Sequence, residues 1–192
     1  MIYHSGYIDR IALIKWFRKW YAFGMSTGEG NKSKYRSIDI KYTPWVLKEY
    51  KYWTLLLHDD QWYLGRAYVW LVREGGMQRF SELENPEYIE MKMVMQEYEQ
   101  VLENLYNPDF MNYAWLANMF VEHGGHGHLH LIPRYRNERI FAGTTFIDGR
   151  WGKNYSPSEE FKPAENILIQ IRDAIKNELS TMDFSSNIVH LR

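Results

Sequence analysis

Short hydrophobic stretches, rich in aromatic and aliphatic residues and separated by polar residues, recur along the chain, and they predict β-strands. Aromatic and aliphatic residues fill YKYWTLLL (50–57) and GRAYVWLV (65–72), and HDDQWYL between them is short and polar enough for a turn. We therefore expect an antiparallel hairpin here. Residues 112–121 are also aromatic and apolar, and they are compatible with a further strand.

The period changes to three and four residues after Pro86, which predicts a long α-helix. Asn85 is the expected N-cap, Pro86 occupies the first helical position, and NPDF (107–110) ends the helix. The apolar stripe of this helix consists of Met91, Val94, Met95, Tyr98, Val101, Leu102 and Leu105. The helix residues Glu87, Glu90, Glu97 and Glu103 lie largely off that stripe.

A second helix is predicted near the C-terminus, beginning close to Pro163. Its apolar face consists of Ile167, Leu168, Ile171, Ile175 and Leu179. Residues 136–160 contain several Gly and Pro residues, and we expect them to be irregular. The order of strands and helices predicts an α+β fold, with an antiparallel sheet that carries helices.

The first part of the chain differs in composition from the rest. Residues 10–23 mix basic and apolar side chains and could form a basic amphipathic helix, whereas residues 24–34 are rich in Gly, Ser and Lys and are typical of a linker. We therefore predict an N-terminal extension and linker at 1–34 and one folded domain at 35–192.

Three histidines alternate with other residues in HGHLHLIPRY (126–135). Because side chains on a strand point to opposite faces in turn, His126, His128 and His130 are expected on one face. Leu129 and Leu131 then face the core. We expect Pro133 to end this strand.

Composition excludes several classes of protein. The formal net charge of the 192 residues is −1, so the chain lacks the strong positive charge that nucleic acid binding favours. It has no Cys, which excludes disulfides, Cys-based zinc sites and thiol nucleophiles. No apolar run is long enough for a membrane span, and the N-terminus does not resemble a signal peptide. We expect a cytoplasmic protein that does not bind nucleic acid.

Three imidazoles on one strand face are costly to bury without polar partners, so they are expected to face a cleft or a ligand. A zinc site is one interpretation, although residues at i and i+4 of a strand lie about 13 Å apart, too far to share one ion unless the strand bends. Nucleophilic attack on phosphorus is a second, with the central His128 attacking and its neighbours orienting the phosphoryl group. A purely structural role is the third.

The segment HGHLHLIPR (126–134) resembles the His-x-His-x-His-x-x signature of the histidine triad (HIT) family of nucleotide hydrolases and transferases. QWYLGRAYVW (61–70) is similar to the second strand of that family. Residues 80–118 are similar to its long helix and to the Asn-Tyr-x-x-Leu-x-Asn segment of members akin to dinucleoside polyphosphate hydrolases. The resemblance covers about residues 50–155 and implies the α+β fold of this family, usually paired as a homodimer through the long helix and neighbouring strands.

The resemblance also implies roles for particular residues. His128 would be the nucleophile that attacks the α-phosphate of a nucleotide, with His126 and His130 as supporting members. Asn112 and Asn118 match positions where members use polar side chains against phosphate or to orient the site. The carboxylate that binds ribose hydroxyls would be Asp59 or Asp60, and spacing does not separate the two.

Two features depart from the family pattern. Many members have Gly-His at the start of the second strand, where this chain has Gly65-Arg66; Arg66 could still bind phosphate or could point to solvent. The segment before the triad, MFVEHGG, is longer than usual and adds His123, which could enter the site or lie in a loop. This insertion puts the role of Asn118 in doubt and could weaken catalysis.

Other residues near these motifs have less specific roles. Trp62 and Tyr63 could stack on a base or could belong to the core or a dimer contact. Arg134 is expected to form a salt bridge or a cap at the end of the triad strand. Arg150 and Lys153 are expected to be solvated loop charges.

These observations predict a nucleotide hydrolase or nucleotidyl transferase that acts on a dinucleoside polyphosphate or similar nucleotide through a covalent nucleotidyl-histidine. No cofactor is required by this chemistry, although Mg²⁺ could accompany the substrate polyphosphate. Two alternatives stay open at this point. One is a non-catalytic nucleotide-binding protein of the same fold, and the other is a zinc protein that uses His123, His126, His128 and His130.

Overall fold

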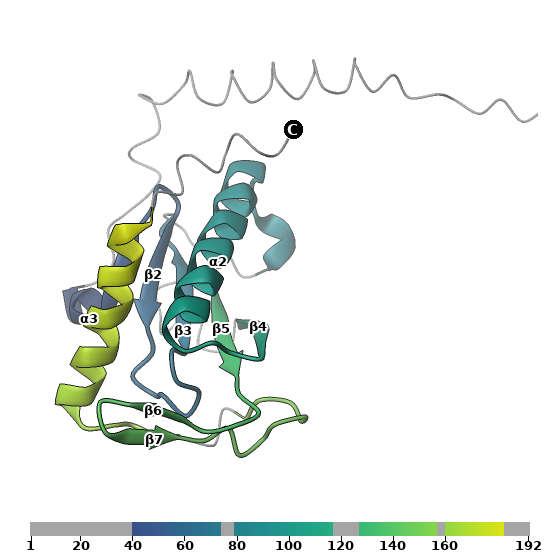
Figure 1. Cartoon of the computed structure of the whole chain (residues 1–192). Coiled ribbons are helices and arrows are strands. Elements are labelled where there is room, and N and C mark those ends of the chain that lie inside the picture. Colours follow the sequence, from purple (N-terminus) through teal and green to yellow (C-terminus); the bar gives the residue numbers. More distant parts are fainter. Residues whose placement is uncertain (1–39, 74–78, 117–126, 157–159, 183–192) are drawn as a thin grey trace, which may run out of the picture. The chain divides into compact units, whose positions relative to one another are not determined.

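The computed structural model describes residues 40–73, 79–116, 127–156 and 160–182. The predicted N-terminal extension and its basic segment, residues 10–23, lie outside these ranges. In the described ranges the chain forms a five-stranded antiparallel sheet, a separate two-stranded hairpin and two α-helices (Figure 1). This arrangement confirms the predicted α+β fold.

The strands of the main sheet follow the order β1–β2–β3–β5–β4, and each pair of neighbours is antiparallel. Their bounds are Val46–Glu49 (β1), Trp53–Leu57 (β2), Ala67–Leu71 (β3), Phe110–Leu116 (β4) and His128–Arg134 (β5). The predicted hairpin is confirmed as the β2–β3 pair, in which Leu55 faces Val69.

Pro133 lies within β5, so the prediction that it ends the strand is wrong. The reason is that β3 pairs with β5 only as far as Leu131, the partner of Ala67. Beyond that point, among the residues that the structure describes, β5 pairs only with β4, where Met111 is opposite Pro133. A proline is tolerated in such a position because no second ladder needs its missing N–H.

The two helices are α2 (Asn85–Leu105) and α3 (Glu165–Thr181), which lie beside each other in Figure 1 and pack together. The long helix begins one residue earlier than predicted, because Glu84 rather than Asn85 is the N-cap. The backbone N–H of Glu84 donates to the Glu87 carboxylate at 2.8 Å, which satisfies a donor at the start of the helix. The predicted apolar faces of both helices are confirmed.

The core lies between these helices and one face of the sheet. Val94, Tyr98 and Leu102 of α2 are fully buried there, and α3 contributes Ile171 and Ile175. Full burial of an aliphatic side chain of this size contributes about 1.5–3 kcal/mol to folding, so these stripes hold the helices on the sheet.

Two glutamates of α2 are buried, although the sequence placed both off the apolar stripe. Glu97 accepts a hydrogen bond from the Tyr50 hydroxyl at 2.6 Å and pairs with Lys48. Glu87 pairs with Arg73 at 3.2 Å. Partners in β1 and in the segments that follow β1 and β3 therefore extend the buried surface of the helix beyond its apolar stripe.

Residues 136–160 are not entirely irregular as predicted, because they contain the hairpin of β6 (Arg139–Phe141) and β7 (Thr144–Phe146). Its two-residue turn, Ala142-Gly143, has positive φ angles of 48° and 75°. Positive φ at both central residues suits the turn that matches the twist of a tight hairpin. The segment lacks the Asn-Gly or Asp-Gly pair that is typical of such a turn, so the hairpin was not predicted.

The second face of the main sheet carries β5 side chains of even number and is opposite the helices. We call this face, defined by Tyr68, Trp70, His128 and His130, the histidine face. The 3₁₀-helix η2 (Ile40–Trp45) contacts it through Tyr42, whose ring lies 4.9 Å from the Trp70 ring. No helix in the described ranges is long and apolar enough to cross a membrane.

Candidate functional site

Strand β5 presents two of the three predicted histidines side by side. His128 is opposite Trp70 of β3 and His130 is opposite Tyr68, whereas Leu129 faces the core, as predicted. The centroids of the two imidazole rings are 5.1 Å apart, in an edge-to-face arrangement. Both histidines are largely buried, with exposed fractions of 9% and 6%.

The third histidine, His126, and the predicted phosphate residue Asn118 lie outside the described residues, as does His123. Their roles therefore stay predictions. Among the described residues, no group of three or more His, Cys, Asp or Glu side chains could hold a metal ion.

His58, which was not among the predicted site residues, also lies on the histidine face. It follows directly after β2, and its ring lies 5.6 Å from that of His130 and 5.8 Å from that of Tyr68. The alternation of faces along β2 could have identified His58, because Leu56 is opposite Tyr68 and His58 is two residues further on. Residues two apart on a strand share a face.

The two adjacent aspartates after β2 differ sharply in environment. Asp60 is buried, and its Oδ2 pairs with the Arg66 guanidinium. Its Oδ1 accepts hydrogen bonds from the backbone N–H groups of Trp62 at 3.0 Å and Phe161 at 2.9 Å. Both oxygens of Asp60 therefore hold the loop and the chain segment before α3 in place.

Asp59 is half-exposed at the edge of the histidine face. One of its oxygens lies 3.2 Å from Nδ1 of His58 and the other 2.9 Å from Nζ of Lys162. The contact with His58, and then the charge of Lys162, hold the pKa of Asp59 well below its usual range. Asp59 is thus an ionised carboxylate that solvent can reach, which Asp60 is not.

Arg66 is also buried, so it does not point to solvent. Its pairing with Asp60 neutralises the charge that the sequence offered for phosphate. A buried ion pair of this kind requires both partners, because either charge alone would be left in a region of low polarity. The geometry favours a role for Arg66 in holding the β2–β3 turn.

Asn112 of β4 is opposite Ile132 and so lies on the same side of the sheet as His130. It lines a cavity of about 590 Å³ together with Met111, Tyr113, Asn154 and Tyr155. This volume is in the range of small-molecule sites. The lining residues of this cavity include Asn112 and Asn154, whose side-chain amides can donate and accept hydrogen bonds.

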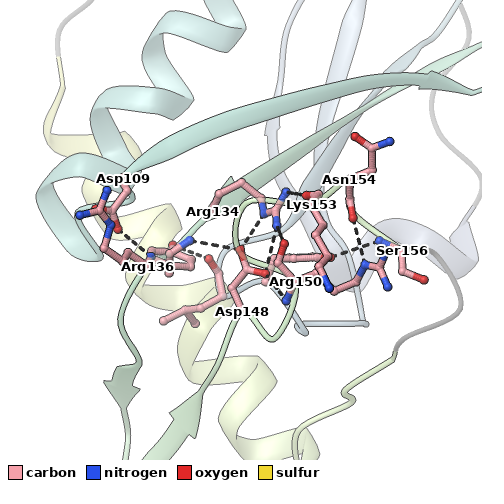
Figure 2. A network of polar contacts seen from close by, with 11 residues as sticks. Asp109, Arg134, Arg136, Asp148, Arg150, Lys153, Asn154 and Ser156 are labelled. Carbon is pink, nitrogen blue, oxygen red and sulfur yellow. Dashed lines mark hydrogen bonds and ion pairs between the residues drawn. The ribbon is translucent and has the colours of Figure 1, made fainter.

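The loop that carries Asn154 and Tyr155 is fixed to β5 by a buried ion pair (Figure 2). The Arg134 guanidinium donates to both carboxylate oxygens of Asp148, at 2.7 and 3.1 Å. It also donates to the backbone carbonyls of Arg150 at 2.7 Å and Lys153 at 2.9 Å. The sequence predicted a salt bridge at Arg134, and the structure adds that it shapes one wall of the cavity.

Aromatic side chains surround the histidines, but they are not the pair that the sequence suggested for base stacking. Tyr63 is fully buried, with the Arg134 guanidinium 5.2 Å from its ring. The rings that contact the histidines are Tyr68, 6.1 Å from His128, and Trp70, 6.4 Å from His128. Their alternation in AYVWL matches that of the triad, which is the signal that could have identified them.

The fold is similar to that of several histidine triad proteins of known structure. A histidine triad protein from Sinorhizobium meliloti has a TM-score of 0.55 and 13% identity, over 76% of this chain and 98% of that chain. One from Bradyrhizobium japonicum has a TM-score of 0.54 and 13% identity, with the same coverage. One from Marinobacter aquaeolei has a TM-score of 0.51 and 21% identity, over 78% and 99%.

The C. elegans NitFhit protein also matches, with a TM-score of 0.47, but it is a longer protein and this chain spans only 27% of it. No protein-family model and no curated protein matches the sequence. The structural matches confirm the predicted histidine triad fold, at identities that are informative about the fold alone.

We predict that Asp148→Asn destabilises the protein by about 3 kcal/mol, because it leaves the buried Arg134 guanidinium without a charged partner. The free energy of unfolding in urea measures this change. Asp173→Asn is the matched control, since its pair with Arg172 is exposed on α3 and is expected to contribute less than about 1 kcal/mol. Similar small losses in both variants would contradict the role of Arg134–Asp148 as the anchor of the loop.

Proposed function

We propose that this chain is a histidine triad enzyme that hydrolyses or transfers a nucleoside monophosphate from a dinucleoside polyphosphate or a similar nucleotide. The observation that carries the proposal is the adjacent pair His128 and His130 on a mostly aromatic face, in a fold shared with histidine triad proteins. A row of imidazoles against ring faces suits a substrate that combines phosphate with a base.

His128 acts as the nucleophile. Its ring nitrogen forms a bond to the α-phosphorus, while the bond from that phosphorus to the bridging oxygen of the leaving phosphate breaks. The leaving phosphate keeps the electron pair. Water or another acceptor then attacks the nucleotidyl-histidine and restores the free imidazole. His130 and His126 donate hydrogen bonds to the phosphoryl oxygens as charge develops.

Asp59 accepts hydrogen bonds from the ribose hydroxyls. Its support is that Asp59 is ionised, half-exposed and beside the histidine face, whereas Asp60 is buried in its ion pair with Arg66. Asn112 and its cavity receive the part of the substrate beyond the reacting phosphate, with Asn118 as a further polar contact. Mg²⁺ enters, if at all, with the substrate polyphosphate.

A nucleotide-binding protein without turnover is the second candidate. The observation that favours it is the commitment of Arg66 to Asp60, which removes one cation from the phosphate region. Such a protein would bind nucleotide at the same face and release no product.

We also propose that the chain forms a homodimer. Within the described residues, β4 has a paired neighbour only on its β5 side, so one edge of the sheet is open. Large apolar side chains are exposed close to this edge and along α2: Phe80, Tyr88, Ile89, Met93 and Tyr113. Phe80 contacts Trp115 of β4, which joins the two parts of this surface.

The dimer is tested by sedimentation of the wild type, expected at twice the mass of one chain. Ile89→Glu on this surface is expected to shift the protein toward monomer. Ile140→Glu, on β6 and 69% exposed, is the matched control and is expected to leave the dimer intact. A wild-type monomer at micromolar concentration, or a dimer disrupted only by Ile140→Glu, would contradict this surface.

The proposed activity is tested with diadenosine tetraphosphate in ¹⁸O-labelled water. The wild type is expected to release AMP that carries the label and ATP that does not, because water finally attacks the α-phosphorus. His128→Asn is expected to lower the rate by at least about 10³-fold through loss of the nucleophile.

Lys92→Asn, an exposed change on α2, serves as the control and keeps the wild-type rate. Label in ATP instead of AMP would refute attack at the α-phosphate. Tight nucleotide binding without any product would favour the non-catalytic candidate.

A further inference from the structure

His58 has a fixed position and a fixed direction on the histidine face. Its backbone N–H donates to the carbonyl of Arg66 at 3.1 Å, and its own carbonyl accepts from the Gln61 side chain at 2.6 Å. These bonds hold the residue at the end of β2. Its ring is then in contact with His130 and Tyr68, and 23% of the side chain is exposed to solvent.

The hydrogen bonds of the His58 ring decide which nitrogen carries a proton. The backbone N–H of Asp60 points at Nδ1 from 3.0 Å. A backbone N–H can only donate, so in the neutral ring Nδ1 carries the lone pair and Nε2 carries the hydrogen.

The carboxylate of Asp59 also lies 3.2 Å from this Nδ1, and an acceptor there would suit a protonated nitrogen. In the cationic ring both nitrogens are donors, so Nδ1 then donates to Asp59. Nε2 carries a hydrogen in both cases. The loop 59–60 therefore engages one edge of the ring and leaves an N–H donor on the other, whatever the charge of the imidazole.

That donor makes no hydrogen bond to any residue within the described ranges. The loop residues occupy the Nδ1 edge, and the ring packs beside His130 and Tyr68 on the histidine face. We propose that His58 is a substrate-contacting residue whose Nε2–H donates a hydrogen bond to a phosphate oxygen of the bound nucleotide, next to His130. This inference rests on the proposed function for the identity of the ligand but not on turnover.

A matched pair of substitutions separates ligand binding from a structural role. In His58→Asn the side-chain oxygen can still accept from the Asp60 N–H, but the distal donor is lost. In His58→Gln the longer side chain keeps an N–H donor close to the position of Nε2. A purely structural histidine is therefore replaced better by Asn, and a phosphate donor better by Gln.

Calorimetric titration with AMP and with adenosine provides the readout. We expect His58→Asn to weaken AMP binding about tenfold and to leave adenosine binding unchanged, because a hydrogen bond to a charged oxygen is lost. His58→Gln is expected to retain most of the AMP affinity. Wild-type AMP affinity in His58→Asn, equal losses for AMP and adenosine, or no AMP binding by the wild type would each overturn the proposal.

Nitrogen-15 spectra of the histidine rings provide a second measurement, the chemical shifts of the ring nitrogens, which a purely structural role of His58 would not make sensitive to AMP. The His58 signals, assigned by their absence in His58→Asn, are expected to show a protonated Nε2 that shifts with AMP and not with adenosine. If Nε2 shifts with AMP but the chain yields no labelled AMP from diadenosine tetraphosphate, the contact holds and the catalytic proposal fails.

Discussion

The register between β3 and β5 is the constraint on which the rest of the site depends. With Tyr68 opposite His130 and Trp70 opposite His128, every second residue of both strands belongs to the histidine face. A slip of one residue would exchange the two faces and place the imidazoles against the helices. Burial of Leu129 and Leu131 under α2 and α3 opposes that slip, because each would lose about 1.5–3 kcal/mol by exposure.

Two buried ion pairs fix the loops around this face. Asp60 pairs with Arg66 in the β2–β3 turn, and Asp148 pairs with Arg134 beneath the loop that leads to the cavity. In both pairs the carboxylate also accepts hydrogen bonds from backbone N–H groups. The charge that stays accessible to solvent is that of Asp59. The adjacent residues Asp59 and Asp60 therefore differ in role: Asp60 is structural, and Asp59 can contact a ligand.

Local periodicity in the sequence predicted much of this arrangement, because the face of a strand or helix on which a residue lies depends on its near neighbours along the chain. The period of two around His128 and the stripes of both helices identified which side chains are buried together. Contacts between segments that are distant in the sequence could not be predicted from such local patterns. The place of His58 beside His130 depends on strand order, and the different roles of Asp59 and Asp60 depend on the N–H of Phe161, a residue that no local pattern connects to that turn.

The most direct test of the account is the mass of the intact protein after brief mixing with diadenosine tetraphosphate. If His128 is the nucleophile, the wild type gains the mass of one adenylyl group and His128→Asn gains none, whereas His126→Asn still forms the adduct. An adduct of the same mass on His128→Asn would contradict the account. So would AMP released at the wild-type rate by that variant, since the phosphate would then be attacked without this histidine.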